Sequence, residues 1–230
     1  MKKQILVMAM ALMLSFGAMA QGKLQFKAFD GTITGGVKFA MNLPHFWGGS
    51  LPHGFRNGGQ VGLFAEYRFN KPELSKWSIA PELVFSSQGG KFKVSQAVAK
   101  VMGEKFEFQG MAAALDKELV ITSNYINIPI MVKYRLSPFF SVEAGPQVGF
   151  NVYSKTTASG SIAGIDAGSK TADLKDNTNT VDFGLGLGGT FNVTDNLFVQ
   201  ARYTMGFTKV FDGDQDIKNG NIFVGLGYKF

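Results

Sequence analysis

The sequence predicts an all-β protein: an eight-stranded antiparallel up-and-down transmembrane β-barrel with long external loops and short periplasmic turns. Three observations predict this fold. An export signal stands at the start, apolar and polar residues alternate through eight later segments, and the connections between these segments are alternately short and long. Together they place the chain in the cell outer membrane after export to the periplasm.

Residues 1–20 have the features of a secretory signal peptide. Two lysines precede an apolar run over 5–16, and Ala18-Met19-Ala20 supplies a small-x-small cleavage motif. The apolar run is shorter than the roughly 20 residues that a membrane-spanning helix needs. We therefore expect a signal peptide over 1–20 and one outer-membrane β-barrel domain over 21–230.

Composition excludes several classes of function. The 230 residues contain no cysteine, which rules out disulfide scaffolds, thiolate metal sites, cysteine nucleophiles and a lipoprotein anchor. The net charge of +6 is too mild to indicate a nucleic-acid partner. The expected partners are outer-membrane lipid and lipopolysaccharide, the barrel-insertion machinery and a partner of the external loops that the sequence does not identify. No cofactor is expected.

Eight segments alternate with the period of two that β-strands require. In the last of them, Ile222, Val224, Leu226, Tyr228 and Phe230 share one face, and Phe223, Gly225, Gly227 and Lys229 share the other. The predicted strands cover residues 33–43, 61–69, 77–85, 126–136, 140–152, 181–192, 197–207 and 222–230.

Short and long connections alternate between the predicted strands. Residues 70–76, 137–138 and 194–196 form short turns. The long connections cover residues 44–57, 88–124, 154–180 and 211–220, with a short amphipathic helix expected over 95–101. Short periplasmic turns and long external loops are typical of bacterial outer-membrane barrels.

Alternation alone leaves open which face of the strands points outward. A secreted lipocalin-like barrel would enclose the apolar face around a ligand, whereas a membrane barrel would turn it toward lipid. Glycines gather on the polar face, where a narrow lumen has little room. Tyr228 and Phe230 end the chain like the insertion signal of outer-membrane barrels. The apolar stripes end in aromatic residues that suit membrane-interface girdles: Phe39, Phe69, Trp77, Tyr134, Phe140, Tyr203, Phe207 and Tyr228.

The chain resembles the PorT-like family of small outer-membrane β-barrels, also described as porin-family or outer-membrane β-barrel domain proteins. The resemblance runs from about residue 33 to residue 230. The segments that carry it include Gly36-Val37-Lys38, Gly62-Leu63-Phe64-Ala65-Glu66-Tyr67-Arg68-Phe69, Glu143-Ala144-Gly145-Pro146-Gln147-Val148-Gly149 and Gly225-Leu226-Gly227-Tyr228-Lys229-Phe230. The resemblance implies the barrel fold and the outer membrane; PorT itself is tied to a secretion system, a role that no residue here singles out.

Ten charged residues fall on the face predicted to line the lumen. They are Lys38, Glu66, Arg68, Glu82, Lys133, Arg135, Glu143, Asp182, Arg202 and Lys229. Unpaired buried charges are very unfavourable, so these side chains are expected to pair as a network that plugs the lumen and sets strand register. The alternatives are a thin, gated water path and, third, a catalytic lumen.

Three further motifs carry weaker signals. Gly184-x-Gly186-x-x-Gly189 matches a dinucleotide fingerprint by letter, but alternation continues where that motif needs a helix. Asp212, Asp214 and Asp216 begin like a calcium loop, yet its glycine and its final glutamate are missing. His45 and His53, with Ser50 nearby, offer the parts of a Ser–His–acid hydrolase, against the simpler interpretation as loop residues.

The sequence therefore favours a non-enzymatic outer-membrane scaffold that stabilises the membrane or presents its external loops for surface interactions. The alternatives are a narrow pore or secretion-system accessory, which would differ in ion conductance, and an outer-membrane enzyme. The enzyme requires a histidine, an acid and a nucleophile to meet at the membrane rim.

Overall fold

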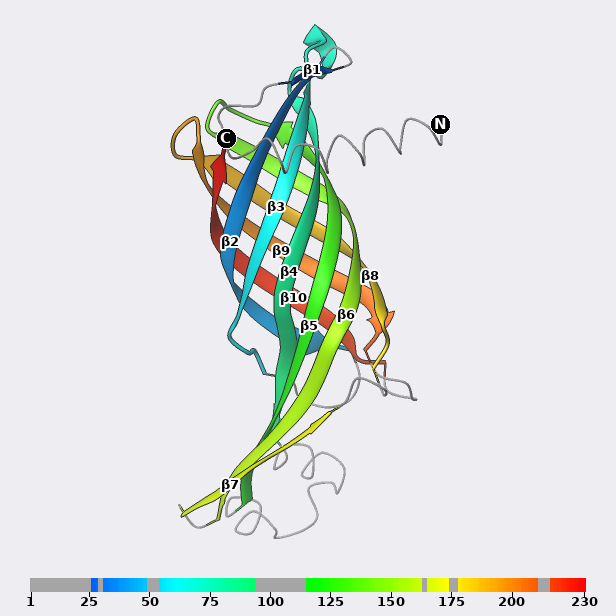
Figure 1. The fold of residues 1–230 in the computed structure, drawn as a ribbon, viewed down its shortest axis with the longest axis vertical. Coiled ribbons are helices and arrows are strands. Elements are labelled where there is room, and N and C mark those ends of the chain that lie inside the picture. Colours follow the sequence, from blue (N-terminus) through cyan, green and yellow to red (C-terminus); the bar gives the residue numbers. More distant parts are fainter. Residues whose placement is uncertain are drawn as a thin grey trace.

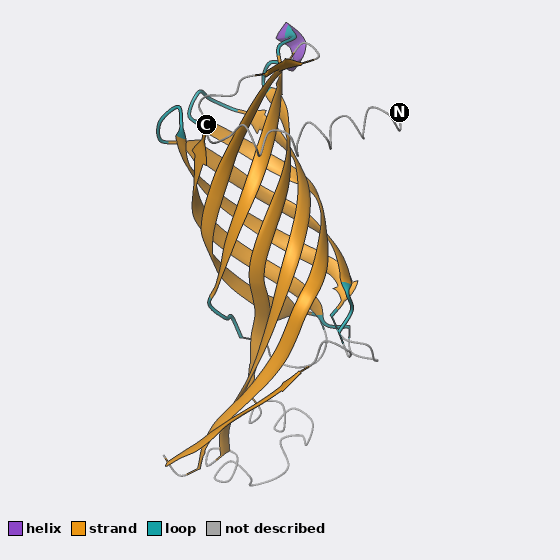
Figure 2. Cartoon of the chain, in the orientation of Figure 1, coloured by secondary structure: helices purple, strands orange, loops and turns teal. Residues whose placement is uncertain are grey.

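The computed structural model describes residues 26–28, 31–48, 54–93, 115–162, 165–173, 178–210 and 216–230. Within these residues the chain is almost entirely strand, apart from one short 3-10 helix, η2 (Pro72–Leu74) (Figure 2). The strands are β1 (Phe26–Ala28), β2 (Gly31–Trp47), β3 (Gly58–Phe69), β4 (Trp77–Lys93), β5 (Leu115–Arg135), β6 (Phe140–Ile162), β7 (Ile165–Asp173), β8 (Val181–Asn192), β9 (Leu197–Lys209) and β10 (Lys218–Lys229).

Eight of these strands close into a barrel. Each pairs antiparallel with its neighbours in the order β2-β10-β9-β8-β6-β5-β4-β3, and a further β2–β3 pairing closes the ring. The three-residue β1 pairs only with β2, and β7 pairs only with β6, so both lie off the ring. The eight-stranded antiparallel up-and-down barrel predicted from the sequence is confirmed, and each predicted strand lies within an observed one apart from single terminal residues.

Three strands continue far beyond the barrel on one side, which corrects the predicted loops. β4 extends to Lys93, β5 begins at Leu115 and β6 runs to Ile162, so parts of the predicted long loops 88–124 and 154–180 are strands. With β7 they form a sheet that projects from one end of the barrel (Figure 1). The helix expected over 95–101 lies outside the described residues.

The short connections gather at the opposite end of the barrel. β3 and β4 are joined through η2, and tight turns join β5 to β6 and β8 to β9. The C-terminal end of β10 lies at this end as well (Figure 1). By the plan of outer-membrane barrels this end faces the periplasm, and the projecting sheet lies outside the cell.

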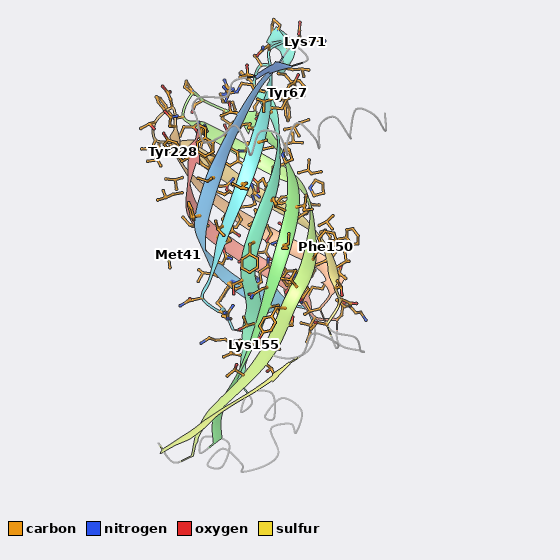
Figure 3. The ribbon with its side chains drawn as sticks, viewed as in Figure 1. Met41, Tyr67, Lys71, Phe150, Lys155 and Tyr228 are labelled. Carbon is orange, nitrogen blue, oxygen red and sulfur yellow. The ribbon has the colours of Figure 1, made fainter. Side chains whose placement is uncertain are left out.

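The apolar parity of the strands faces outward. Met41, Leu187 and Phe183 are 77%, 66% and 57% exposed, whereas the inward Lys38 and Glu143 are 4% and 1% exposed. Met41, Phe150 and Tyr228 project from the outside of the barrel (Figure 3). A soluble ligand-binding barrel would bury the apolar face instead. The outward face is therefore the one that lipid covers.

Two aromatic pairs lie at the periplasmic end of this apolar surface. The ring centroids of Trp77 and Tyr134 are 4.7 Å apart, and those of Tyr228 and Phe230 are 5.9 Å apart. The amphipathic rings of tryptophan and tyrosine prefer the level of the lipid headgroups. In the described part of the chain, no helix is long and apolar enough to cross a membrane.

Candidate functional site: the barrel lumen

Six charged side chains meet in the middle of the lumen and are called the central cluster here. Each comes from a different strand of the barrel: Lys38 (β2), Glu66 (β3), Glu82 (β4), Lys133 (β5), Glu143 (β6) and Arg202 (β9). All six residues are at least nine-tenths buried. Three cations and three carboxylates leave the central cluster formally neutral, as a water-poor interior requires.

Arg202 is the centre of the outer part of this cluster. Its Nη1 and Nη2 each donate to Glu82 over 2.8 Å, and its Nε donates to Glu143 over 2.7 Å. Lys38 Nζ completes the group with a 2.5 Å ion pair to Glu82. This geometry is the bidentate fork that guanidinium and carboxylate groups form best. The contacts tie together strands that are not neighbours in the sheet.

Lys133 links this group to the periplasmic side. Its Nζ lies 3.7 Å from Glu143 and 3.3 Å from Glu66. Glu66 also accepts a 3.0 Å hydrogen bond from Ser78 Oγ, and Glu143 accepts bonds of 2.9 and 3.1 Å from Gln200 Nε2. The carboxylates are thus held by neutral donors as well as by cations, which offsets part of the loss of hydration.

Three inward phenylalanines share the lumen with these charges. Phe223 lies 5.6 Å from Lys38 Nζ and 5.4 Å from Arg202 Cζ, measured from the ring centroid. Phe64 and Phe198 pack edge to face at 5.4 Å, with Lys133 Nζ 5.9 Å from each. Ring faces attract cations, so the aromatic rings stabilise the cationic side of the cluster. Alternation alone could have found all three, because each lies on the inward parity.

Glycines make room for these rings. Gly36 pairs across the sheet with Phe64, and Gly227 pairs with Phe198. A Cβ at either glycine would overlap the opposite ring. The glycine-rich polar parity of β10 therefore has a packing reason in a barrel of only eight strands.

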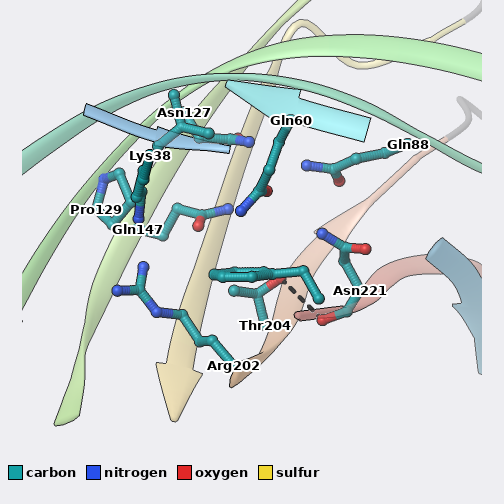
Figure 4. Close-up of a pocket in the computed structure, with 11 residues that line it drawn as sticks. Lys38, Gln60, Gln88, Asn127, Pro129, Gln147, Arg202, Thr204 and Asn221 are labelled. Atoms are coloured by element: carbon teal, nitrogen blue, oxygen red, sulfur yellow. Dashed lines mark hydrogen bonds between the residues drawn. The ribbon is translucent and has the colours of Figure 1, made fainter. Parts of the chain in front are cut away.

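A small cavity lies on the outer side of the central cluster. A cavity of about 10 Å³ lies against Lys38 and Arg202, close to the volume that one water molecule needs (Figure 4). Its other lining residues are Gln60, Val84, Gln88, Asn127, Pro129, Gln147, Thr204, Asn221 and Phe223. Buried acceptor oxygens without a partner among the described residues occur in this half of the lumen, namely Oδ1 of Asn42, Asn151, Asp182, Asn219 and Asn221. We expect ordered water there.

The periplasmic side of the central cluster is more open, and we call this space the vestibule. It has a volume of about 230 Å³. Its lining consists of Glu66, Arg68, Lys133, Arg135, Pro138, Ser141, Thr190, Asn192, Thr194, Asp195 and Lys229. The vestibule begins at the short turns and ends at the central cluster, so it is a blind pocket.

The ten predicted lumen residues divide into three groups. Six form the central cluster. Arg68, Arg135 and Lys229 line the vestibule, where Arg68 is 3.5 Å from Glu66 and Lys229 Nζ donates to Asn192 Oδ1 over 2.6 Å. Asp182 lies apart in the outer half and accepts a 3.0 Å hydrogen bond from Asn219 Nδ2. It has no ion-pair partner in the described part of the chain.

The structure describes only one residue of the proposed hydrolase set, His45. His45 was expected in a loop, but β2 continues to Trp47 and carries His45 on its outer face, 4.8 Å from Phe55 by ring centroids. Among the described carboxylates none pairs with His45, and its Nδ1 has no hydrogen-bond partner there. His53 and Ser50 lie outside the described residues.

The two remaining motifs are local features of strands and turns. Gly184, Gly186 and Gly189 lie in the middle of β8, which continues to Asn192 without the helix that a dinucleotide site needs. Asp216 is exposed, and its hydrogen bond from Lys218 lowers the pKa of its carboxyl. Asp212 and Asp214 lie outside the described residues. Among the residues that the structure describes, no cluster of acidic or histidine side chains could hold a metal ion.

Comparison with known proteins agrees with this architecture. The model of a family described as "Outer membrane protein beta-barrel domain" matches residues 19–212. The chain belongs to this family. Its place in the cell is therefore the outer membrane. No curated protein matches the chain.

Several solved structures are similar to the chain at low sequence identity. Ail, the attachment invasion locus protein of Yersinia pestis, is 17% identical, with 86% of this chain and 98% of Ail covered and a TM-score of 0.46. Neisserial surface protein A is 16% identical, with 86% and 97% covered and a TM-score of 0.40. A major outer membrane protein from Thermus thermophilus is 15% identical, with 84% and 99% covered and a TM-score of 0.40.

Proposed function

We propose that this protein is a closed, non-enzymatic outer-membrane scaffold that presents its external sheet for surface interactions. The observation that carries the proposal is the central cluster. Charged side chains from six strands pair with one another in the middle of the lumen, and the cavity against Lys38 and Arg202 on their outer side has a volume of only about 10 Å³. An open porin needs a far wider lumen, usually made by 16 or more strands.

The projecting sheet supports the second half of the proposal. β4, β5 and β6 continue beyond the barrel, and β7 extends the sheet through pairs from Lys155↔Asp173 to Ile162↔Ile165. Long external strands are unnecessary for crossing a membrane, which takes about 9–11 residues per strand. Exposed elements on a rigid barrel are where binding surfaces usually lie. A PorT-like secretion role remains a prediction from the sequence resemblance.

Deletion of the projecting sheet tests this function without touching the lumen. In the variant, residues 91–120 and 155–175 are each replaced by a short Gly-Asn turn, which leaves every central-cluster residue in place. We expect this variant to reach the outer membrane as a folded barrel and to lose the surface interactions of the intact chain, measured as adhesion of expressing cells to immobilised host-matrix or sibling-cell surfaces. Equal adhesion by both chains would contradict a role for the sheet.

A further inference from the structure

The vestibule gathers more positive than negative charge. Four cationic residues line this space of about 230 Å³: Arg68, Arg135, Lys229 and Lys133. Lys133 already forms ion pairs with Glu66 and Glu143. Lys229 is repelled by Lys133, Arg68 and Arg135 and attracted by Glu66. Like charges held together in a partly enclosed space are unfavourable unless an anion joins them.

The carboxylates at hand do not balance these cations. Glu66 is shared between Lys133 at 3.3 Å and Arg68 at 3.5 Å. Asp195 lines the vestibule, but among the described residues Asp195, Arg135 and Lys229 form no ion pair within 4 Å. Lys229 is instead hydrogen-bonded to the neutral Asn192. Arg135 and Lys229 therefore lack a carboxylate partner among the described residues, and each retains N–H donors for an external anion.

We infer that the vestibule is a binding site for a phosphate group that enters from the periplasm. Guanidinium forks such as those of Arg68 and Arg135 match tetrahedral oxyanions, and Lys229 adds a point charge. Ser141 and Thr190 line the same space, and the Thr190 hydroxyl donates to Glu143 over 3.3 Å. This inference goes beyond the scaffold function and does not depend on it.

The size and shape of the vestibule limit what the phosphate is attached to. A volume of about 230 Å³ is below the roughly 300–1,000 Å³ of pockets that enclose a drug-sized ligand. The central cluster closes the inner end, so the ligand enters and leaves by the mouth near Pro138 and Thr194. Free phosphate or pyrophosphate would fit inside, and the head of a phosphomonoester lipid would fit with its tails outside.

Calorimetric titration of the mature chain in a phosphate-free, non-ionic detergent tests the site at low ionic strength. The probes are inorganic pyrophosphate and, separately, short-chain phosphatidic acid. Saturable binding of one equivalent of either probe is expected. Binding of pyrophosphate identifies a soluble ligand, and binding of phosphatidic acid alone identifies a lipid headgroup.

The matched variants separate the vestibule from general attraction to a cationic protein. The double variant Arg135→Gln/Lys229→Gln removes two cations, and we expect it to weaken binding at least about tenfold, since charged hydrogen bonds are involved. The control pair is Lys71→Gln/Lys76→Gln, which removes two exposed cations at the same end of the barrel outside the vestibule. It should change the affinity less than about twofold.

A measurement on the unmodified chain covers the case in which the double variant does not fold. Arginine side-chain Nε resonances of the wild type are followed by NMR during the pyrophosphate titration. Two arginine signals should shift with the calorimetric affinity, while the buried Arg202 signal stays unchanged. No saturable heat with either probe, or an equal loss of affinity in the Lys71→Gln/Lys76→Gln control, would overturn the inference.

Discussion

Arg202 shows at the scale of one residue how the side chains in the lumen hold one another. It donates to Glu82 and Glu143, which come from strands on other sides of the barrel, and it lies against the ring of Phe223. No rotation of a single side chain would open the centre, because each charge is held by partners from at least two other strands. Buried networks of this kind are sensitive to the loss of any member.

Replacing Glu82 by Gln tests the energetic role of this network. The amide keeps the size of the side chain but leaves Lys38 and Arg202 without one of their carboxylates. We expect the free energy of unfolding to fall by about 3–5 kcal/mol, as for other broken buried ion pairs. Urea titration in detergent micelles, followed by the fluorescence of the two tryptophans, measures it.

The control for this experiment is Lys218→Gln. Its ion pair with Asp216, at 2.8 Å, joins a partly exposed amine to an exposed carboxylate. Exposed pairs contribute about 0–1 kcal/mol. Similar changes in the free energy of unfolding for Glu82→Gln and Lys218→Gln would show that the central cluster does not hold the barrel together.

Glycines on one strand make room for phenylalanine rings on the neighbouring strand. Gly227→Ala places a methyl group against the ring of Phe198 on the neighbouring strand. Overpacking of this kind lowers the free energy of unfolding by about 1–3 kcal/mol. The same urea titration should show this loss, and adding Gly227→Ala to a Phe198→Ala background should cost close to nothing.

Gly59→Ala is the matched control, because the nearest atom to its added Cβ is 3.8 Å away. It should change the free energy of unfolding by less than about 0.5 kcal/mol, as surface changes usually do. If Gly227→Ala remained equally destabilising without the Phe198 ring, the assigned packing would be wrong.

At the scale of elements, the outward face of β8 tests the contact with lipid. Leu187 is 66% exposed in the middle of the strand. In lipid, Leu187→Arg should make folding into vesicles less favourable by about 2–4 kcal/mol, the cost of a cation at the bilayer midplane. Folding yield into vesicles across a urea series measures the difference.

The comparison is Leu74→Arg in η2, which is 40% exposed at the periplasmic end. This change lies outside the lipid and should be within about 0.5 kcal/mol of the wild type. If Leu187→Arg were equally harmless, the face of β8 would be in water, and the membrane assignment would be wrong.

The elements also show what the sequence can predict. Strict alternation located every barrel strand, because lipid and lumen impose opposite demands on successive residues. The partners within the lumen were not predictable, since Arg202 and Glu82 are 120 positions apart and meet only through the stagger of the closed barrel. A rule based on charge also missed Phe64, Phe198 and Phe223. The projecting part of β6 and the strand β7 were missed because they are rich in Ser, Thr and Gly and lack an alternating apolar face.

At the scale of the whole molecule, the orientation of the barrel can be tested because the chain contains no cysteine. Thr157→Cys introduces a thiol on the projecting part of β6, and Ser75→Cys introduces one beside η2. A membrane-impermeant maleimide should label Thr157→Cys on intact cells and Ser75→Cys only after lysis. The opposite pattern would reverse the assignment of the two ends.

Side-chain contacts, strand packing and the size of the ring together determine the space inside the barrel. Ion pairs, glycine–phenylalanine packing and an eight-stranded ring leave the vestibule on the periplasmic side and, against Lys38 and Arg202 on the other side, a cavity for about one water molecule. Under the proposed function, such a barrel anchors the projecting sheet to the membrane and passes no solutes through its centre.

Ion conductance across a planar lipid bilayer tests this account most directly. The purified chain over residues 21–230 is inserted into the bilayer, with an open porin in a parallel bilayer as the positive control. A flat current trace for this chain is predicted, because the central cluster leaves no continuous water path. Reproducible stepwise currents from the folded wild-type barrel would contradict it and would make the protein a narrow pore.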